Sequence, residues 1–410
     1  MGDDSAAWTY PRCVTAYLDH AADTPVLPAA AEAVLAELTR SGNASALHSS
    51  GRAARRVVEE SREEVAAALG ARPGEVVLTG GGTESDNLAV KGLFWARQGE
   101  DPRRTRVLVS SVEHHGVLDP AHWLGQHPAG LRAQVEELPV DGEGRLRVDA
   151  LRESLERDPA SVALVSVMWA NNEVGTLQPL AEVVELAARH GVPVHSDAVQ
   201  AVGQVPVDFA ASGLTALSFT GHKLGGTTGV GGLVLRRGTS LVPVLHGGGQ
   251  EGGVRSGSVD AAAARGLAVA TTAAVSTLAE RSAGLRALRD QLEAAVLAAV
   301  PDAVVRGASR AEDRLPGILH VTVPGAEGDA LLYLLDARGV ECSTGSACTA
   351  GVPQPSHVLR AMGLSDADAA GALRFSLGRT STAADVALVA EVLGPVVERA
   401  RTAGLALAGS

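Results

Sequence analysis

Cysteine is scarce in this 410-residue sequence, which contains only Cys13, Cys342 and Cys348. Three cysteines are too few for a disulfide framework, and a reducing compartment is the natural setting for them. The sequence also lacks the C-x-x-C and H-E-x-x-H patterns that commonly bind zinc. We therefore expect no structural or catalytic metal site.

The sequence has neither a surplus of positive charge nor a long apolar run. Its formal net charge is −12, which argues against direct binding of nucleic acid. A small basic cluster at Arg52, Arg55 and Arg56 is followed by several glutamates at helical spacing, which indicates a solvated helix face. No run reaches the roughly 18 apolar residues of a membrane span, and the acidic N-terminus does not resemble a secretory signal. We therefore expect a cytoplasmic protein without a membrane segment.

Aromatic residues make up only 3% of the chain, although 46% of its residues are hydrophobic and the length allows two domains. Strand-like runs at residues 106–110, 161–167 and 232–235 alternate with amphipathic helical stretches up to about residue 240. This alternation predicts an α/β fold in which helices cover both faces of a sheet. Residues 261–300 have an alanine-rich helical pattern, and the strand-like run at 317–323 predicts an α+β domain after it.

Lys223 occupies the most informative position in the sequence. It follows a run with strand propensity, Ser218 to Thr220, and precedes a glycine-rich turn. Small, apolar and hydroxylic neighbours favour partial burial, which would lower the pKa of the amine and make it a nucleophile toward an aldehyde. Two interpretations remain at this point: a lysine that binds pyridoxal phosphate (PLP) through a Schiff base, or a surface lysine beside a loop.

Two further segments suit a PLP site. Asp197 ends the apolar run that begins at Val192, where a carboxylate could face the pyridine nitrogen of PLP or simply cap the next helix. The turn around Gly82 and Thr83 follows a strand-like run and precedes a helical one, so its backbone N–H groups could bind the phosphate. This turn matches neither the dinucleotide-binding nor the Walker pattern.

Ten short segments together resemble the class I cysteine desulfurases, of the NifS and IscS kind and most like the actinobacterial housekeeping form. They occur in family order from about residue 17 to about residue 382: 17–22, 42–48, 81–85, 113–115, 171–175, 196–200, 221–223, 255–258, 345–348 and 374–379. The resemblance implies a PLP-dependent transferase of fold type I in the class V aminotransferase family. It implies a mostly parallel, seven-stranded sheet in a large domain at 28–275, and a smaller α+β domain made of 12–27 and 276–410.

The resemblance also implies roles for individual residues. Lys223 would bind PLP, Asp197 would pair with its pyridine nitrogen, and His114 would stack on its ring and transfer protons, as a near-neutral imidazole can. Arg374 and Asn43 would bind the substrate, with Arg374 on its carboxylate. The other implied contacts are Asn171 and Gln200 to the phenolic oxygen of PLP, and Gly82, Thr83, Thr220 and His222 to its phosphate, together with Ser258 from the second subunit of a homodimer.

Cys348 is the implied sulfur-carrying residue. It lies among small residues that predict a mobile, exposed loop, where a thiolate could attack the sulfur of bound cysteine. The implied activity is that of a sulfurtransferase, which converts L-cysteine to L-alanine and leaves a persulfide on Cys348 for a sulfur acceptor. Iron–sulfur cluster biogenesis and tRNA thiolation are both possible destinations. Cys342 is expected to be a packing residue at a strand end, and Cys13 is expected to have no role.

Two alternatives to this activity remain open. One is another PLP reaction on the same fold, by a selenocysteine lyase, a C–S lyase or an aminotransferase; the other is a protein that mainly docks in a sulfur-transfer assembly. The chain also departs from the family pattern at Gln250, Gly253 and Thr227–Thr228. Its short C-terminal tail leaves open whether it delivers sulfur to an iron–sulfur scaffold.

Overall fold

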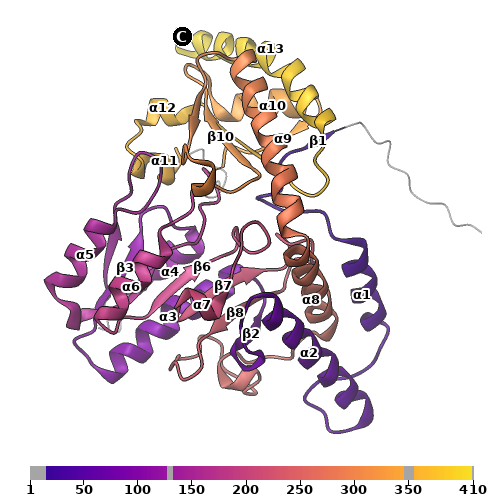
Figure 1. Cartoon of the computed structure of the whole chain (residues 1–410), viewed down its shortest axis with the longest axis vertical. Coiled ribbons are helices and arrows are strands. Elements are labelled where there is room, and N and C mark those ends of the chain that lie inside the picture. The colour runs from indigo at the N-terminus through magenta and orange to yellow at the C-terminus, as the bar shows by residue number, and fades with distance from the viewer. Residues whose placement is uncertain (1–14, 127–132, 346–354, 409–410) are drawn as a thin grey trace, which may run out of the picture.

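The structure is a computed structural model that describes residues 15–126, 133–345 and 355–408. Its elements form two groups, a larger one built on a seven-stranded sheet and a smaller one that contains the C-terminal part of the chain (Figure 1). The smaller group lies above the larger one in this view.

The central sheet has the strand order β2-β8-β7-β6-β5-β3-β4. All its strands except β8 run in one direction, since β8 pairs antiparallel with both β2 and β7. Most of its strands are buried on both faces, which explains their nearly continuous apolar runs. The prediction of a mostly parallel, seven-stranded sheet is confirmed. The strands are β2 (Val76–Thr79), β3 (Arg106–Ser110), β4 (Gln134–Leu138), β5 (Val162–Ser166), β6 (Val194–Asp197), β7 (Ala216–Thr220) and β8 (Gly231–Leu235).

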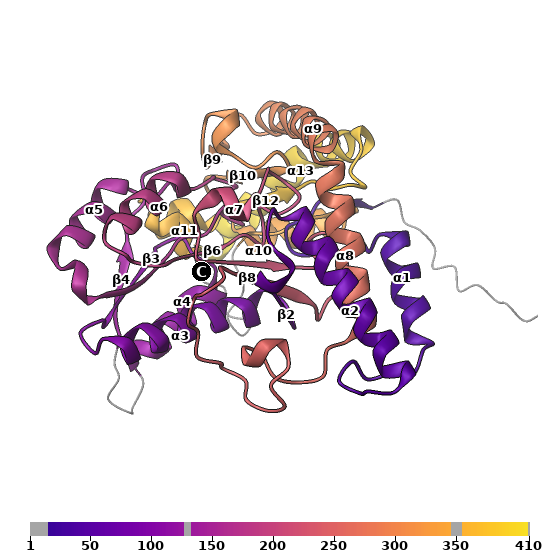
Figure 2. The same ribbon diagram turned by 60° about the horizontal axis from the view of Figure 1, so that its bottom comes forward.

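Helices cover both faces of this sheet, as the alternating pattern predicts. Helices α3 and α4 lie on one face and α5, α6 and α7 lie on the other (Figure 2). Helices α1 and α2 pack against α8 beside the sheet. The bounds are α1 (Pro28–Leu38), α2 (Ser49–Ala68), α3 (Gly82–Glu100), α4 (His115–Gln126), α5 (Val148–Arg157), α6 (Leu180–Arg189), α7 (Phe209–Ser212) and α8 (Ala261–Ser276).

The smaller group contains a three-stranded antiparallel sheet in the order β12-β10-β9. The strand β1 pairs in parallel with β11, so the first described residues join this group, and Leu18 belongs to its apolar core. This agrees with the predicted α+β character, whereas the exact domain bounds stay a prediction. The elements are β1 (Ala16–Tyr17), α9 (Leu278–Ala299), β9 (Val304–Arg306), β10 (Ile318–Thr322), α10 (Gly328–Asp336), β11 (Val340–Glu341), α11 (His357–Ala361), α12 (Asp366–Ala370), β12 (Ala372–Ser376) and α13 (Ala383–Ala408).

Two helices, α8 and α9, connect the groups, and they meet at an angle of 70°. Arg281, in the first turn of α9, stabilises this bend because its guanidinium donates to the carbonyl of Ala274 at 2.8 Å, near the C-terminus of α8. Among the described residues, no single helix is both long and apolar enough to cross a membrane, and only this bent pair meets those criteria when its two helices are combined.

Gly231 offers a test of the packing beneath the turn that follows β2. A Cβ at this position would lie 2.6 Å from the carbonyl oxygen of Phe219 and 2.8 Å from the Cα of Gly81, and both are backbone atoms. We expect Gly231→Ala to lower the free energy of unfolding by about 1–3 kcal/mol, the usual cost of overpacking, in urea denaturation. Gly74→Ala is the matched control, because nothing lies within 4 Å of its added Cβ. Equal unfolding midpoints for the two variants would contradict the packing argument.

Candidate active site

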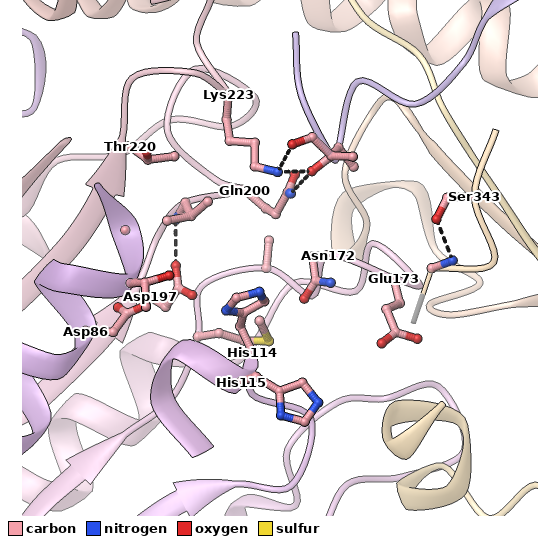
Figure 3. A pocket seen from close by; sticks show the side chains of 18 of the residues that line it. Asp86, His114, His115, Asn172, Glu173, Asp197, Gln200, Thr220, Lys223 and Ser343 are labelled. Carbon is pink, nitrogen blue, oxygen red and sulfur yellow. Dashed lines mark hydrogen bonds between the residues drawn. The ribbon is translucent and has the colours of Figure 1, made fainter. Parts of the chain in front are cut away.

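A cavity of about 340 Å³ lies at the edge of the central sheet where the parallel strands end (Figure 3). One side of its wall consists of residues at or just after the ends of β2, β3, β5, β6 and β7. The other side includes Ser343, Gly345 and Arg374 from the smaller group. Because ligands of open α/β sheets bind at the carboxyl ends of the strands, this cavity is the candidate active site.

Lys223 lines this cavity three residues after β7 ends at Thr220. Its amine donates to the backbone carbonyls of Ala21 and Ala22, which lie in the segment that follows β1. Burial, together with the nearby positive charge of Arg374, lowers the pKa of this amine to about 8. Much of Lys223 is therefore a neutral, nucleophilic amine at mildly alkaline pH.

Asp197 lies at the end of β6 and is only 4% exposed. One carboxylate oxygen accepts from the backbone N–H of Val199 at 2.8 Å, so the residue both closes the local turn and lines the cavity. Burial raises the pKa of Asp197, while the neighbouring His114 and Lys223 act in the opposite direction. A cation that entered the cavity would therefore stabilise the ionised carboxylate.

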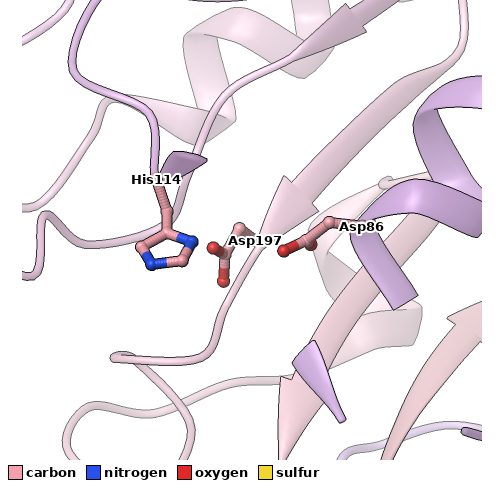
Figure 4. Close-up of side chains that lie close together, drawn as sticks. All are labelled: Asp86, His114 and Asp197. Carbon is pink, nitrogen blue, oxygen red and sulfur yellow. The ribbon is translucent and has the colours of Figure 1, made fainter. Parts of the chain in front are cut away.

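His114 and Asp86 flank Asp197 (Figure 4), and one ring nitrogen of His114 and one carboxylate oxygen from each aspartate lie within 4.8 Å of one another. Burial lowers the pKa of His114. Its Nδ1 accepts from the N–H of Gly116 at 2.9 Å, which assigns the proton of the neutral ring to Nε2. Burial and the charge of Asp197 raise the pKa of Asp86 well above its usual range. Such groups are also donor types of metal sites, so the expected absence of a metal stays a prediction.

The predicted phosphate contacts meet at one end of the cavity, where Gly82, Thr83, Thr220 and His222 all line the wall. Gly82 begins α3, a helix of 19 residues, so unpaired N–H groups and the positive end of the helix dipole face this region. The Thr220 hydroxyl lies 3.1 Å from Nδ1 of His222. This end of the cavity therefore favours an anion.

Arg374 enters the cavity from β12 and is only 4% exposed. It donates to the carboxylate of Asp19 at 2.7 Å and to the backbone carbonyl of Asn172 at 2.9 Å. Its Nε is buried and has no hydrogen-bond partner among the described residues. The guanidinium therefore retains a donor for a further acceptor.

Of the remaining predicted residues that the structure describes, only Gln200 lines the cavity. Its side chain donates to the Ala21 carbonyl at 2.8 Å, next to the Lys223 amine. Asn171 does not line the cavity: its side chain donates to Val112 and accepts from the N–H groups of Glu173 and Val174, and so closes its own loop. Asn43 and Ser258 are exposed and are not among the residues that line the cavity of this chain.

Of the three cysteines, the structure describes only Cys342. Cys348 and Cys13 lie outside the described residues. Cys342 packs against the core of the smaller group, and burial raises the pKa of its thiol to about 12. This environment suits the packing role expected of Cys342, because the thiolate is the reactive form.

Sequence reasoning missed several residues of the cavity wall. Asn172 and Glu173 lie in the segment already recognised at 171–175, where the side chains that face the cavity cannot be told from spacing alone. Asp86 lies four residues after Gly82 on α3, and this helical spacing was the available signal. His357 gave no signal, because α11 reaches the cavity only through tertiary packing.

Comparisons with known proteins identify the family and relatives of the chain. The family model of aminotransferase class-V matches residues 16–389. An IscS-like cysteine desulfurase of Mycobacterium tuberculosis is 58% identical over 395 residues, which cover 96% of this chain and 99% of that protein. Among solved structures, a NifS-like protein from Rickettsia africae superposes with a TM-score of 0.82 at 28% identity, covering 94% of this chain and 99% of that one. SspA in complex with cysteine superposes with a TM-score of 0.75 at 32% identity, covering 88% of this chain and 99% of that one.

The chain belongs to the aminotransferase class-V family, whose members with this fold are PLP-dependent enzymes. Within this family it is a cysteine desulfurase of the IscS and NifS type.

The lowered pKa of Lys223 can be measured directly, because the sequence contains only two lysines, Lys91 and Lys223. In cofactor-free protein labelled with ¹³C-lysine, we expect one of two side-chain signals to titrate with a midpoint near 8. The neutral form is favoured above that pH, and about a tenth of the amine is neutral at pH 7. Lys223→Arg should remove this signal, whereas Lys91→Arg should leave it unchanged. A midpoint above 10 would contradict the burial argument.

Proposed function

We propose that this enzyme converts L-cysteine to L-alanine and places the released sulfur on Cys348, which passes it to an acceptor. The observation that carries the proposal is the meeting of Lys223, Asp197 and Arg374 in one cavity, although they come from two different sheets. A nucleophilic amine, a buried carboxylate and a cation at these positions match the needs of a PLP enzyme that acts on an amino acid.

The cavity fits PLP at both ends. The backbone N–H groups at the start of α3, with Thr220 and His222, would hold the phosphate, and Asp197 would face the pyridine nitrogen. A pyridinium beside Asp197 would compensate the burial that raises the pKa of this carboxylate. When bound, PLP supplies an aldehyde that reacts with amines and a protonated ring that withdraws electrons from the attached amino acid.

The substrate would be oriented by Arg374. Its guanidinium suits the carboxylate of an amino acid, which would compete with Asp19 for the Nη2 donor that Asp19 accepts from. Asn172, whose carbonyl Arg374 contacts, lies on the same wall. SspA, a solved relative with 32% identity, binds cysteine, which supports L-cysteine as the substrate here.

His114 would manage the protons of the reaction. Because burial keeps it neutral and Gly116 engages its Nδ1, the ring holds a proton on Nε2. Lys223 would be a second proton carrier, since the pKa of its amine is lowered to about 8. Together they would remove a proton from the substrate carbon and return one to the carbon that becomes the methyl group of alanine.

Cys348 would receive the sulfur. Its thiolate would attack the sulfur of the substrate, an S–S bond would form as the carbon–sulfur bond breaks, and a proton would add to the carbon to complete alanine. The products, alanine and a persulfide, balance the cysteine and thiol consumed. Gly345 lines the cavity, and Cys348 follows three residues later in the sequence, which supports this assignment.

The proposed partners are a second copy of this chain and a sulfur acceptor. Ser258 is exposed and is not among the residues that line the cavity of its own chain, which supports a homodimer in which it contacts the phosphate held by the other subunit. The sulfur acceptor would be a protein of iron–sulfur cluster assembly or of tRNA or cofactor thiolation. We place the enzyme in the cytoplasm, where three cysteines in 410 residues would stay reduced.

The pair of lysines also provides a test of cofactor attachment. After borohydride reduction of the PLP-loaded enzyme, we expect the cofactor on one peptide only, the one with Lys223, because its amine faces the cavity. Lys91 instead lies 4.4 Å from the centre of the Trp123 ring, away from the cavity. Lys91→Arg should keep the label and Lys223→Ala should lose it, as read by mass spectrometry. A stable label in Lys223→Ala would refute the assignment.

The proposed chemistry is tested by replacing the nucleophile. Cys348→Ser should still bind PLP and L-cysteine, as followed by absorbance, because those steps use Lys223, Asp197 and Arg374. Release of alanine and formation of persulfide should fall by orders of magnitude, because a hydroxyl is a weak nucleophile toward sulfur. Cys342→Ala is the matched control and should keep most of the activity. Wild-type release of alanine by Cys348→Ser, or its loss in Cys342→Ala, would show that the nucleophile is misassigned.

A further inference from the structure

The long connection between β8 and α8 carries Ser258, and it extends along the bottom of Figure 2. Its glycine-rich part, residues 247–258, is called the Ser258 loop here. A segment with so many glycines has high conformational entropy, so holding one side chain in place requires specific anchors. The structure contains three anchors.

The first anchor folds the loop on itself. The side-chain oxygen of Gln250 accepts from the N–H of Gly257 at 2.9 Å, directly before Ser258. The Ser256 hydroxyl also accepts from the N–H of Gly249 at 3.3 Å. Gln250, one of the departures from the family pattern, therefore fixes the backbone that presents Ser258.

The second anchor ties the loop to the strand β2. The Glu251 carboxylate accepts from Arg62 at 2.6 and 2.8 Å and from the N–H of Leu78 at 2.7 Å. The side chain of Arg62 is only 10% exposed and that of Glu251 only 3%. Glu251 has a φ of 47°, an unfavourable value for a residue with a side chain, and these contacts hold it there.

The third anchor joins the loop to the phosphate-binding turn. Arg255, three residues before Ser258, donates to Glu84 at 2.8 and 3.4 Å. The same Glu84 carboxylate accepts from the N–H of Gly80 at 2.7 Å, in the turn that leads into α3. Glu84 thus lies between the phosphate end of its own cavity and the loop that presents Ser258.

We infer that Glu84, Arg255 and Gln250 are positioning residues for Ser258, and that they set the affinity for PLP in the partner subunit without touching the cofactor themselves. The inference rests on the proposed function, in which Ser258 contacts the phosphate bound by a second copy of this chain. It assigns Glu84 a role in both sites of the dimer, through Gly80 in its own site and through Arg255 in the other.

A double-mutant cycle on PLP affinity tests this inference. Ser258→Ala and Glu84→Gln are each expected to weaken binding of PLP to the cofactor-free protein by on the order of tenfold, the range of one hydrogen bond to a charged group. Glutamine keeps an oxygen that can accept from Gly80, so Glu84→Gln removes mainly the charge that Arg255 contacts. The double variant should bind no more weakly than Ser258→Ala alone, because nothing remains to be positioned.

If the losses of PLP affinity from Ser258→Ala and Glu84→Gln add up in the double variant, the inference is overturned. Glu84 would then act on PLP binding through the Gly80 turn of its own chain and not through Ser258. Arg255→Lys, which keeps the charge but loses the planar fork, should repeat the non-additive result. Glu100→Gln is the matched control on the same helix, since its ion pair with Arg97 lies at the far end of α3. Its PLP affinity should equal that of the wild type.

The outcomes separate the inference from the proposed function. If Ser258→Ala weakens PLP binding and Glu84→Gln does not, the inference alone fails. If sedimentation shows a monomer, or Ser258→Ala leaves the affinity unchanged, the shared site and the inference fail together. The unfolding temperatures of the cofactor-free variants should match that of the wild type within a few degrees. A large decrease in the unfolding temperature of both Glu84→Gln and Arg255→Lys would instead indicate that this ion pair has only a structural role.

Discussion

The parallel pairing of β6 with β7 is the constraint on which the active site depends. Asp197 is in register with Ser218, so the carboxylate and the segment that leads to Lys223 leave the sheet side by side. The strands β2, β3 and β5 run in the same direction, and their ends bring the α3 turn, His114 and Asn172 to the same edge. Side chains far apart in sequence meet because they share this edge.

Burial of ionisable groups gives this edge its chemistry. It lowers the pKa values of Lys223 and His114 and raises those of Asp197 and Asp86. Each shift moves a group toward its neutral form, which suits a nucleophilic amine and a proton carrier near neutral pH. A bound pyridinium and phosphate would add charges beside these groups. Empty and loaded states of the enzyme are therefore expected to differ in stability.

The smaller group of elements completes a site that the central sheet only begins. Arg374 reaches the cavity from β12, and Asp19, which it contacts, follows the N-terminal strand β1. The Ser258 loop contributes from outside the cavity, through anchors at Glu84 and Arg62. The proposed substrate contact and the proposed dimer contact thus both depend on segments that are distant from Lys223 in the sequence.

The alternation of strand-like runs with helical stretches predicted a sheet covered by helices, because burial on both faces of a sheet produces nearly continuous apolar runs. The number of strands and the class of enzyme were predicted only from the resemblance of the ten segments to the cysteine desulfurases. Local spacing could not decide between Asn171 and Asn172, since only the packed loop shows that the first closes its own backbone and the second faces the cavity. The approach of Asp86 to Asp197 and of His357 to the cavity, and the ion pair of Glu84 with Arg255, were likewise decided by the tertiary structure. These contacts join elements whose order in the sequence does not reveal how close they lie in the folded protein. Only tertiary packing brings their charged groups together.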